Sequence, residues 1–204
     1  EGRMLVVSAH DAAPLLRQGA LINDNIVAAY SNLLCHAAQK IGIKLRVVPP
    51  NFLPFLEANG WDGVDNYTNL TRSGAPSWRD ADLVFIPCFF GNNQSGHWTA
   101  LVLWKHNNAI TPFYMDSLKS YRRESAINQH FGKMPMFPEK PVRMMTTPQQ
   151  HASSNDCAVF TLLVFASFLH AYSLNLQGTA PSAIELTTTA DTFGHQGRHH
   201  ILRA

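Results

Sequence analysis

The sequence predicts an α+β domain in which helices flank a central sheet. Residues 83–116 read as neighbouring strands, and segments with helical features lie on both sides of them in the chain. The chain has 204 residues, of which 46% are hydrophobic and 15% are charged, so it is long enough for one domain with a sizeable core. We therefore expect a single domain that spans residues 1–204.

The segment before the strands contains one clear helix and one irregular stretch. Apolar residues recur at helical spacing over Asn23–Ile41, behind an Asn23-Asp24 start that suits a helix cap. Leu45–Val48 follows as a short strand that Pro49-Pro50 ends. Residues 51–82 mix glycines, prolines and aromatic residues, a pattern typical of turns rather than of one continuous element. Long irregular stretches in compact domains are more often functional than idle, so we predict a substrate-binding insertion at 51–82.

The strands form a predicted hairpin that brings two polar side chains together. Leu83–Pro87 begins the sheet, and His97–Trp104 and Ile110–Asp116 then flank a turn at Asn107-Asn108. The far ends of strands paired in this way lie side by side. We therefore expect the His97 imidazole to meet the Asp116 carboxylate.

The segment after the hairpin leads to a cysteine at the start of a helix. Leu118–Phe131 is predicted to be a surface helix and Val142–Thr146 a strand. A polar loop then ends at Asn155-Asp156, both good N-cap residues, and an almost wholly apolar run follows as far as Leu169. Cys157 thus lies in a first helical turn, where the helix dipole favours a thiolate. Taken alone, it is equally consistent with a small buried core residue.

The C-terminal part of the chain is predicted to contain little regular structure. A short helix is expected near Ser182–Ala190, and Phe193–Ala204 is expected to be a loose tail. A metal-binding tail built on His195, His199 and His200 is the weaker alternative, because no carboxylate or thiol completes such a site.

Composition and charge argue against several classes of protein. The formal net charge of +2 includes no basic run, so we expect no nucleic-acid partner. No apolar run approaches the roughly 18 residues of a membrane span, so no span is expected. Cys35, Cys88 and Cys157 cannot all pair and lack the spacing of a zinc site. We therefore expect free thiols in a reducing cytosol, and neither a metal nor a cofactor.

His97, Asp116 and Cys157 together supply a base, an orienting carboxylate and a nucleophile. The imidazole would take the proton of the Cys157 thiol, and Asp116 would hold the ring tautomer and stabilise its positive charge. Gln149 or Gln150 would add a side-chain amide that binds an oxyanion together with the Cys157 backbone N–H. Each residue alone has an ordinary structural explanation, but their joint occurrence indicates acyl-transfer chemistry.

The order of these motifs resembles the ubiquitin-like-protein cysteine protease clan, which includes the adenovirus endopeptidase, the SUMO-specific proteases and bacterial effector deubiquitinases. The resemblance implies a papain-like, adenain-type fold, with a central mixed sheet and the nucleophile at a helix N-terminus. It also implies His97 as base, Asp116 as carboxylate, Gln150 as oxyanion donor and Cys157 as nucleophile. The matching segments are Ile22–Tyr30, Leu83–Pro87, Gly96–Thr99, Tyr114–Leu118, Pro148–Gln150 and Asn155–Cys157.

Three positions depart from the pattern of the SUMO-specific enzymes. Leu21 stands where those enzymes carry a Trp that, with the Trp after the base, roofs the channel for the Gly-Gly tail, so Trp98 keeps only half of that aromatic pair. Ala158 replaces the usual Gly after the nucleophile, which a helix start tolerates. The loop before Cys157 is one residue longer, so Gln149 and Gln150 both stay open as donors, with Gln150 favoured.

The resemblance implies a thiol isopeptidase that cleaves after the C-terminal Gly of ubiquitin or a relative such as SUMO or NEDD8. A bacterial effector secreted into the host cell is the implied setting. The alternatives are an effector acetyltransferase of the same clan that uses acetyl-CoA, and a catalytically inactive ubiquitin-binding module. We predict substrate contacts at Leu21, Asp24, Trp98, Gln149 and Asn155, and anchors in the insertion at Trp61, Tyr67 and Trp78.

Overall fold

A five-stranded mixed sheet forms the centre of the protein. The computed structural model describes residues 8–17, 20–61, 76, 77, 80–91, 95–106, 109–132, 141–174, 198 and 201. Within them the strand order is β1-β2-β3-β4-β5, with β1 parallel to β2, β4 parallel to β5 and the other pairs antiparallel. The strands are β1 (Leu45–Val47), β2 (Leu83–Gly91), β3 (Gly96–His106), β4 (Ala109–Met115) and β5 (Arg143–Met144).

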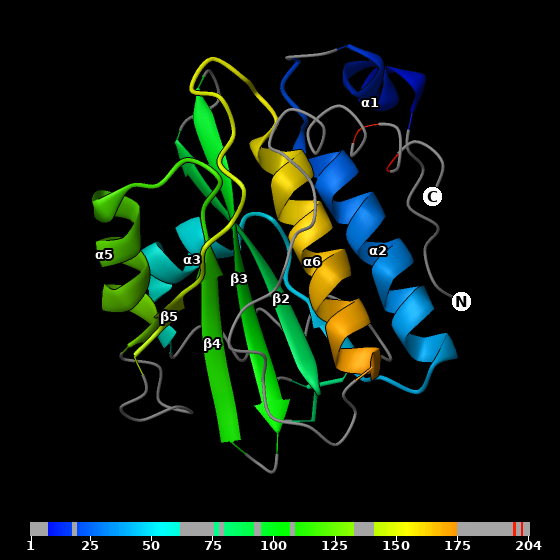
Figure 1. Ribbon diagram of the computed structural model, residues 1–204, viewed down its shortest axis with the longest axis vertical. Helices are drawn as coiled ribbons and strands as arrows, with labels where there is room; N and C mark the ends of the chain where they lie inside the picture. The colour runs from blue at the N-terminus through cyan, green and yellow to red at the C-terminus, as the bar shows by residue number, and fades with distance from the viewer. Residues whose placement is uncertain are drawn as a thin grey trace.

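Helices cover both faces of this sheet (Figure 1). Helices α2 and α6 lie side by side on one face, and α3 and α5 lie on the other. The short helices α1 and η1 precede α2 near its N-terminal end. The helices are α1 (Ala9–Ala12), the 3-10 helix η1 (Ala13–Leu16), α2 (Asp24–Lys40), α3 (Phe52–Asn59), α5 (Tyr121–Phe131) and α6 (Cys157–Leu174).

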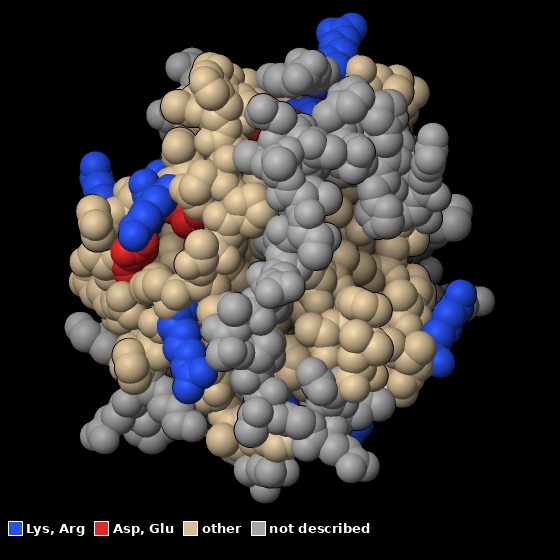
Figure 2. Space-filling view, in the orientation of Figure 1, with Lys and Arg blue, Asp and Glu red and all other residues tan. Residues whose placement is uncertain are grey.

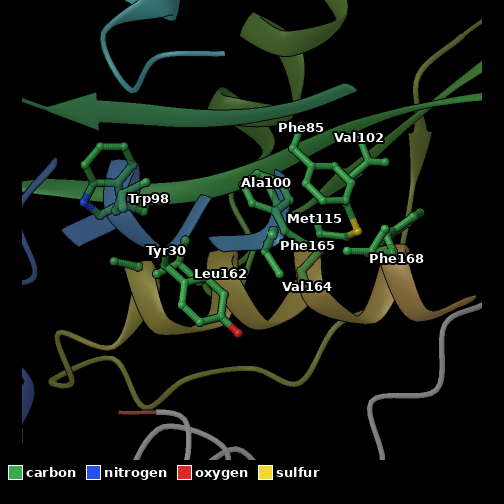
Figure 3. Packing of buried hydrophobic residues seen from close by; sticks show 14 of the residues in the cluster. Tyr30, Phe85, Trp98, Ala100, Val102, Met115, Leu162, Val164, Phe165 and Phe168 are labelled. Carbon is green, nitrogen blue, oxygen red and sulfur yellow. The ribbon is translucent and has the colours of Figure 1, made fainter. Parts of the chain in front are cut away.

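Alternation of side chains along the strands produces two hydrophobic cores. Phe85, Val102 and their neighbours face α2 and α6, where the rings of Phe85 and Phe165 stack with centroids 4.7 Å apart (Figure 3). Ile86 and Leu101 point to the opposite face and pack against α3 and α5. The sheet is therefore buried on both faces, and its strands read as nearly continuous apolar runs.

The two helices that carry the site begin where the sequence predicts. The Asn23 side chain accepts a hydrogen bond from the Ile26 N–H at 3.1 Å and caps α2. The Asp156 carbonyl accepts from the Phe160 N–H at 3.0 Å, so α6 begins with Cys157 in its first turn. The expectation that no apolar run approaches a membrane span is too strict, because α6 has suitable length and composition, as a buried core helix also does.

The predicted hairpin is confirmed, and β2 extends further than the sequence indicates. β3 and β4 pair antiparallel from Ala100 opposite Met115 to His106 opposite Ala109. β2 continues through Pro87 to Gly91 because it pairs with β3 along that whole length. Among the described residues β1 pairs only with residues 83–85, so Pro87 lies where β2 has a strand on one side, a position that tolerates proline.

Two predictions about less regular segments are corrected. The segment 51–82 begins with helix α3, whose Phe52, Leu53 and Leu56 are buried against the sheet. At the C-terminus, Arg198 and Ile201 are buried at 2% and 7% exposure, so these two positions of the predicted loose tail pack against the protein. The predicted helix at 182–190 and the tail histidines lie outside the described residues, as does the turn at 107–108.

Candidate active site

The ends of β3 and β4 bring a histidine and a carboxylate into contact. His97 is the second residue of β3 and Asp116 directly follows β4. Their Nε2 and Oδ1 atoms are 2.7 Å apart, and both side chains are largely buried. Because the ionised carboxylate only accepts hydrogen bonds, His97 Nε2 carries the donated proton, and Nδ1 is the ring nitrogen left to react.

The Asp116 carboxylate also binds a second cation that the sequence analysis missed. Arg123 on α5 donates from Nε to Oδ2 at 2.8 Å, and its Nη2 donates to the Leu118 carbonyl. The Leu118 N–H donates to Oδ1 at 2.9 Å. Burial opposes ionisation of Asp116, but the hydrogen bonds from His97, Arg123 and Leu118 outweigh it and hold its pKa below the usual range. The carboxylate is therefore ionised and oriented on both oxygens.

Cys157 lies at the N-terminus of α6 beside the histidine. Its side chain is within hydrogen-bonding reach of His97 and is 3% exposed. Burial favours the neutral form of His97, but hydrogen bonds and charge from Asp116 and Cys157 outweigh burial and raise its pKa. Cys88 is different, because complete burial raises the pKa of its thiol and leaves it unreactive.

The two candidate glutamines have different surroundings. Gln149 donates from Nε2 to the Asp116 carbonyl at 3.0 Å and accepts from the Lys119 N–H at 3.0 Å, so its amide is used to hold the Asp116 loop. Gln150 accepts from the Ser117 hydroxyl at 2.8 Å and donates to the Ser154 carbonyl at 3.0 Å. Because Ser154 lies in the loop that leads to Cys157, Gln150 is the glutamine that connects the carboxylate loop to the nucleophile loop.

A cleft of about 410 Å³ lies next to His97 and contains three of the predicted substrate contacts. Leu21, Asp24 and Trp98 line it, so the start of α2 forms one wall and β3 another. The Trp98 ring packs on Phe89 with centroids 4.8 Å apart. A Cβ at Gly96 would lie 2.0 Å from the Phe89 ring, so only glycine permits this packing. The cleft thus has an apolar, supported wall at Trp98, the residue that follows His97 in β3.

The other predicted contacts lie elsewhere. Asn155 is exposed and directly precedes Asp156. Trp61 donates from its indole N–H to the His130 carbonyl at 2.8 Å and packs on Phe131 with centroids 5.4 Å apart. Its ring thus takes part in the packing between α3 and α5 and is only partly buried, so a substrate contact at Trp61 stays a prediction. Tyr67 and Trp78 lie outside the described residues.

The sequence matches the family model of the Ulp1 protease family, C-terminal catalytic domain, over residues 20–179. The chain belongs to this family. It is therefore a cysteine protease of the ubiquitin-like-protein protease clan, and the predicted adenain-type fold is confirmed. No curated protein matches the sequence.

Solved structures of this family share the fold. The SUMO protease Ulp1 with its catalytic cysteine oxidised to a sulfinic acid aligns with a TM-score of 0.67 at 19% identity, over 100% of this chain and 86% of that chain. Ulp1 in complex with Smt3, the yeast ortholog of SUMO, gives 0.65 at 19%, over 97% and 83%. The Xanthomonas campestris effector XopD bound to ubiquitin gives 0.65 at 14%, over 90% and 92%.

Replacement of Asp116 by Asn should change the pH profile as well as the rate. Asp116 raises the pKa of His97, so its loss lowers that pKa and moves the alkaline limb of kcat/KM to lower pH. We expect a loss of roughly 10²- to 10⁴-fold in kcat, with some activity retained. Steady-state cleavage of a modifier C-terminal reporter between pH 5 and pH 10 measures both effects. An unchanged profile would show that Asp116 does not act on the imidazole.

Replacement of Arg123 by Gln should move the alkaline limb in the opposite direction. Without the guanidinium, Asp116 interacts more strongly with the imidazolium and one repelling cation is gone, so the pKa of His97 rises further. The same pH series measures this shift together with a lower kcat. Arg122→Gln is the matched control, because Arg122 is the exposed neighbour on the same helix. If both variants behave alike, the Arg123 contact has no influence on the site.

Proposed function

We propose that this protein is a thiol isopeptidase that cleaves after the C-terminal Gly of ubiquitin or a ubiquitin-like modifier. The observation that carries the proposal is that one imidazole, His97, lies 2.7 Å from the Asp116 carboxylate and also interacts with the Cys157 thiol at the N-terminus of α6. Membership of the Ulp1 protease family supports the same substrate class. His97, Asp116, Cys157 and Gln150 are the proposed catalytic residues.

The proposed reaction begins with proton transfer from the Cys157 thiol to Nδ1 of His97. The thiolate attacks the carbonyl carbon of the modifier's terminal Gly, and the oxyanion is bound by the Cys157 N–H and the Gln150 side-chain amide. The C–N bond then breaks, and the imidazolium gives its proton to the departing amine. A water molecule, deprotonated by His97, hydrolyses the thioester and releases the modifier and free Cys157.

The cleft supports a role in binding the extended tail of the modifier. Leu21 is 50% exposed and faces the same cleft as Trp98, so one wall is aliphatic where the SUMO-specific pattern has a second aromatic ring. A leucine occupies less of the channel than a tryptophan. We infer that the channel accepts the bulkier residues that precede Gly-Gly in ubiquitin, and that ubiquitin is preferred over SUMO.

The cellular setting is also a proposal. The likeness to an effector that was solved bound to ubiquitin, together with thiols at Cys88 and Cys157 that form no disulfide, supports an enzyme delivered into the reducing cytosol of a host cell. Lys and Arg lie in separate spots on the face drawn in Figure 2, which weighs against the basic pocket expected of an effector acetyltransferase on that face.

We further propose that residues 1–204 form one domain, with the segment after α3 as the substrate-binding part of 51–82.

Replacement of Cys157 by Ala should abolish cleavage of a ubiquitin C-terminal reporter while the fold persists. The thiol is the nucleophile in this proposal, and alanine is accommodated at the same helical position. His97→Ala should be nearly as damaging, because no other proposed base accepts the thiol proton. Cys35→Ala is the matched control, since Cys35 lies within α2. Turnover of Cys157→Ala at the wild-type rate would refute the proposed enzyme.

Electrophilic probes built on ubiquitin, SUMO and NEDD8 test the specificity. We expect a mass shift on Cys157 with ubiquitin ahead of SUMO, and Leu21→Trp should reduce the rate with ubiquitin more than with SUMO by narrowing the cleft. Leu33→Trp is the control, because Leu33 is an exposed leucine of α2 that does not line the cleft. Labelling by SUMO and not by ubiquitin would refute the preference.

A further inference from the structure

Arg198 is a buried cation next to the nucleophile loop, and the proposed reaction does not use it. Its side chain is 2% exposed. Nε donates to the Asp156 carboxylate at 2.6 Å, and Nη2 donates to the Asn155 carbonyl at 3.4 Å. Asn155 and Asp156 are the two residues directly before Cys157. The guanidinium therefore binds the loop that carries the nucleophile.

The same guanidinium also binds the segment that leads into the cleft. Nη1 donates to the Pro14 carbonyl and Nη2 to the Ala20 carbonyl, each at 2.8 Å. Ala20 directly precedes Leu21, which lines the cleft. Figure 1 shows the described C-terminal residues in red near the N-terminal ends of α2 and α6. One side chain thus connects the nucleophile loop to the cleft wall, across sequence separations of 42 and 178 residues.

The chemistry of arginine suits this connection. Its planar guanidinium presents several N–H donors in fixed directions, and here they meet one carboxylate and three backbone carbonyls. Asp156 balances the buried charge, and its own carbonyl accepts the hydrogen bond from Phe160 in the first turn of α6. Any displacement of Asp156 would therefore move the thiol and the backbone N–H of Cys157.

We propose that Arg198 is a positioning residue that holds Cys157 and the Leu21 wall of the cleft at the correct separation. The proposal rests on the proposed function, because it takes Cys157 as the nucleophile. Loss of Arg198 changes two things at once. The thiol and oxyanion donor shift, which lowers kcat, and the cleft wall is released, which raises KM.

A purely structural role for Arg198 predicts a different result. In that case the side chain would only dock the C-terminal part of the chain, as Ile201 does by packing into the core that contains α2 and α6. Loss of either residue would then lower stability and leave the reactivity of the folded protein unchanged. Ile201→Ala is therefore the matched control for C-terminal docking.

The experiment compares Arg198→Gln, Arg198→Lys and Ile201→Ala in the 204-residue chain, at a temperature where circular dichroism shows each to be folded. Two rates are measured: alkylation of Cys157 by iodoacetamide, read by mass spectrometry, and cleavage of a ubiquitin C-terminal reporter. We expect Arg198→Gln to lower kcat/KM about 100-fold, through both kcat and KM, because a misplacement of about 1 Å costs this much. Its Cys157 alkylation should slow as well, since this reaction needs no modifier binding.

The lysine variant and the control separate the explanations. Arg198→Lys keeps the charge beside Asp156 but not the fork of donors, so we expect a smaller loss that falls mainly on KM. Ile201→Ala should keep the wild-type rates of Cys157 alkylation and of reporter cleavage.

Equal kinetics for Arg198→Gln and Ile201→Ala would overturn the proposal. If Arg198→Gln does not fold, wild-type kcat and KM in Arg198→Lys would overturn it instead. A wild-type chain that neither reacts at Cys157 nor cleaves the reporter would refute the proposed function itself.

Discussion

Helix α6 is apolar over most of its surface, so its stability depends on burial. Its buried side packs on β3 and α2, and Phe165 stacks on Phe85 of β2. A helix packed in this way cannot slide or rotate without loss of interlocking contacts. Its first turn is therefore held at the end of the sheet where His97 and Asp116 meet. The geometry of the candidate site follows from core packing, and its polar residues refine it.

Two arginines refine the site from opposite sides. Arg123 binds the carboxylate that orients His97, and Arg198 binds the carboxylate that precedes Cys157. A buried carboxylate without such a partner would be costly. Each arginine also donates to nearby carbonyls, so it fixes the adjoining loop. His97 and Cys157 are thereby held by separate ion pairs that come from different parts of the chain.

The cleft, for which we propose a role in substrate choice, is built from the same elements. Its walls come from the start of α2 and from β3, which are also the elements that pack around α6 and carry His97. Leu21 itself precedes α2 and is half exposed, so its side chain can vary without loss of core packing. The indole of Trp61, by contrast, is partly buried between α3 and α5 and packs against the core on the sheet's other face. Aromatic residues in this chain thus serve two separate purposes, which composition alone does not distinguish.

Local patterns in the sequence determined the helix at Asp24–Lys40, the hairpin that pairs His97 with Asp116, and the helix that begins at Cys157. Each rests on periodicity, caps or turns within about 20 residues, where chain geometry restricts the outcome. Only the tertiary structure revealed the contacts of Arg123 and Arg198, the different hydrogen-bond partners of Gln149 and Gln150, and the packing of Trp61 on Phe131. These depend on which side chain reaches a carboxylate or carbonyl. For Arg198 the partners lie up to 184 residues away, a separation over which sequence spacing carries no geometric information.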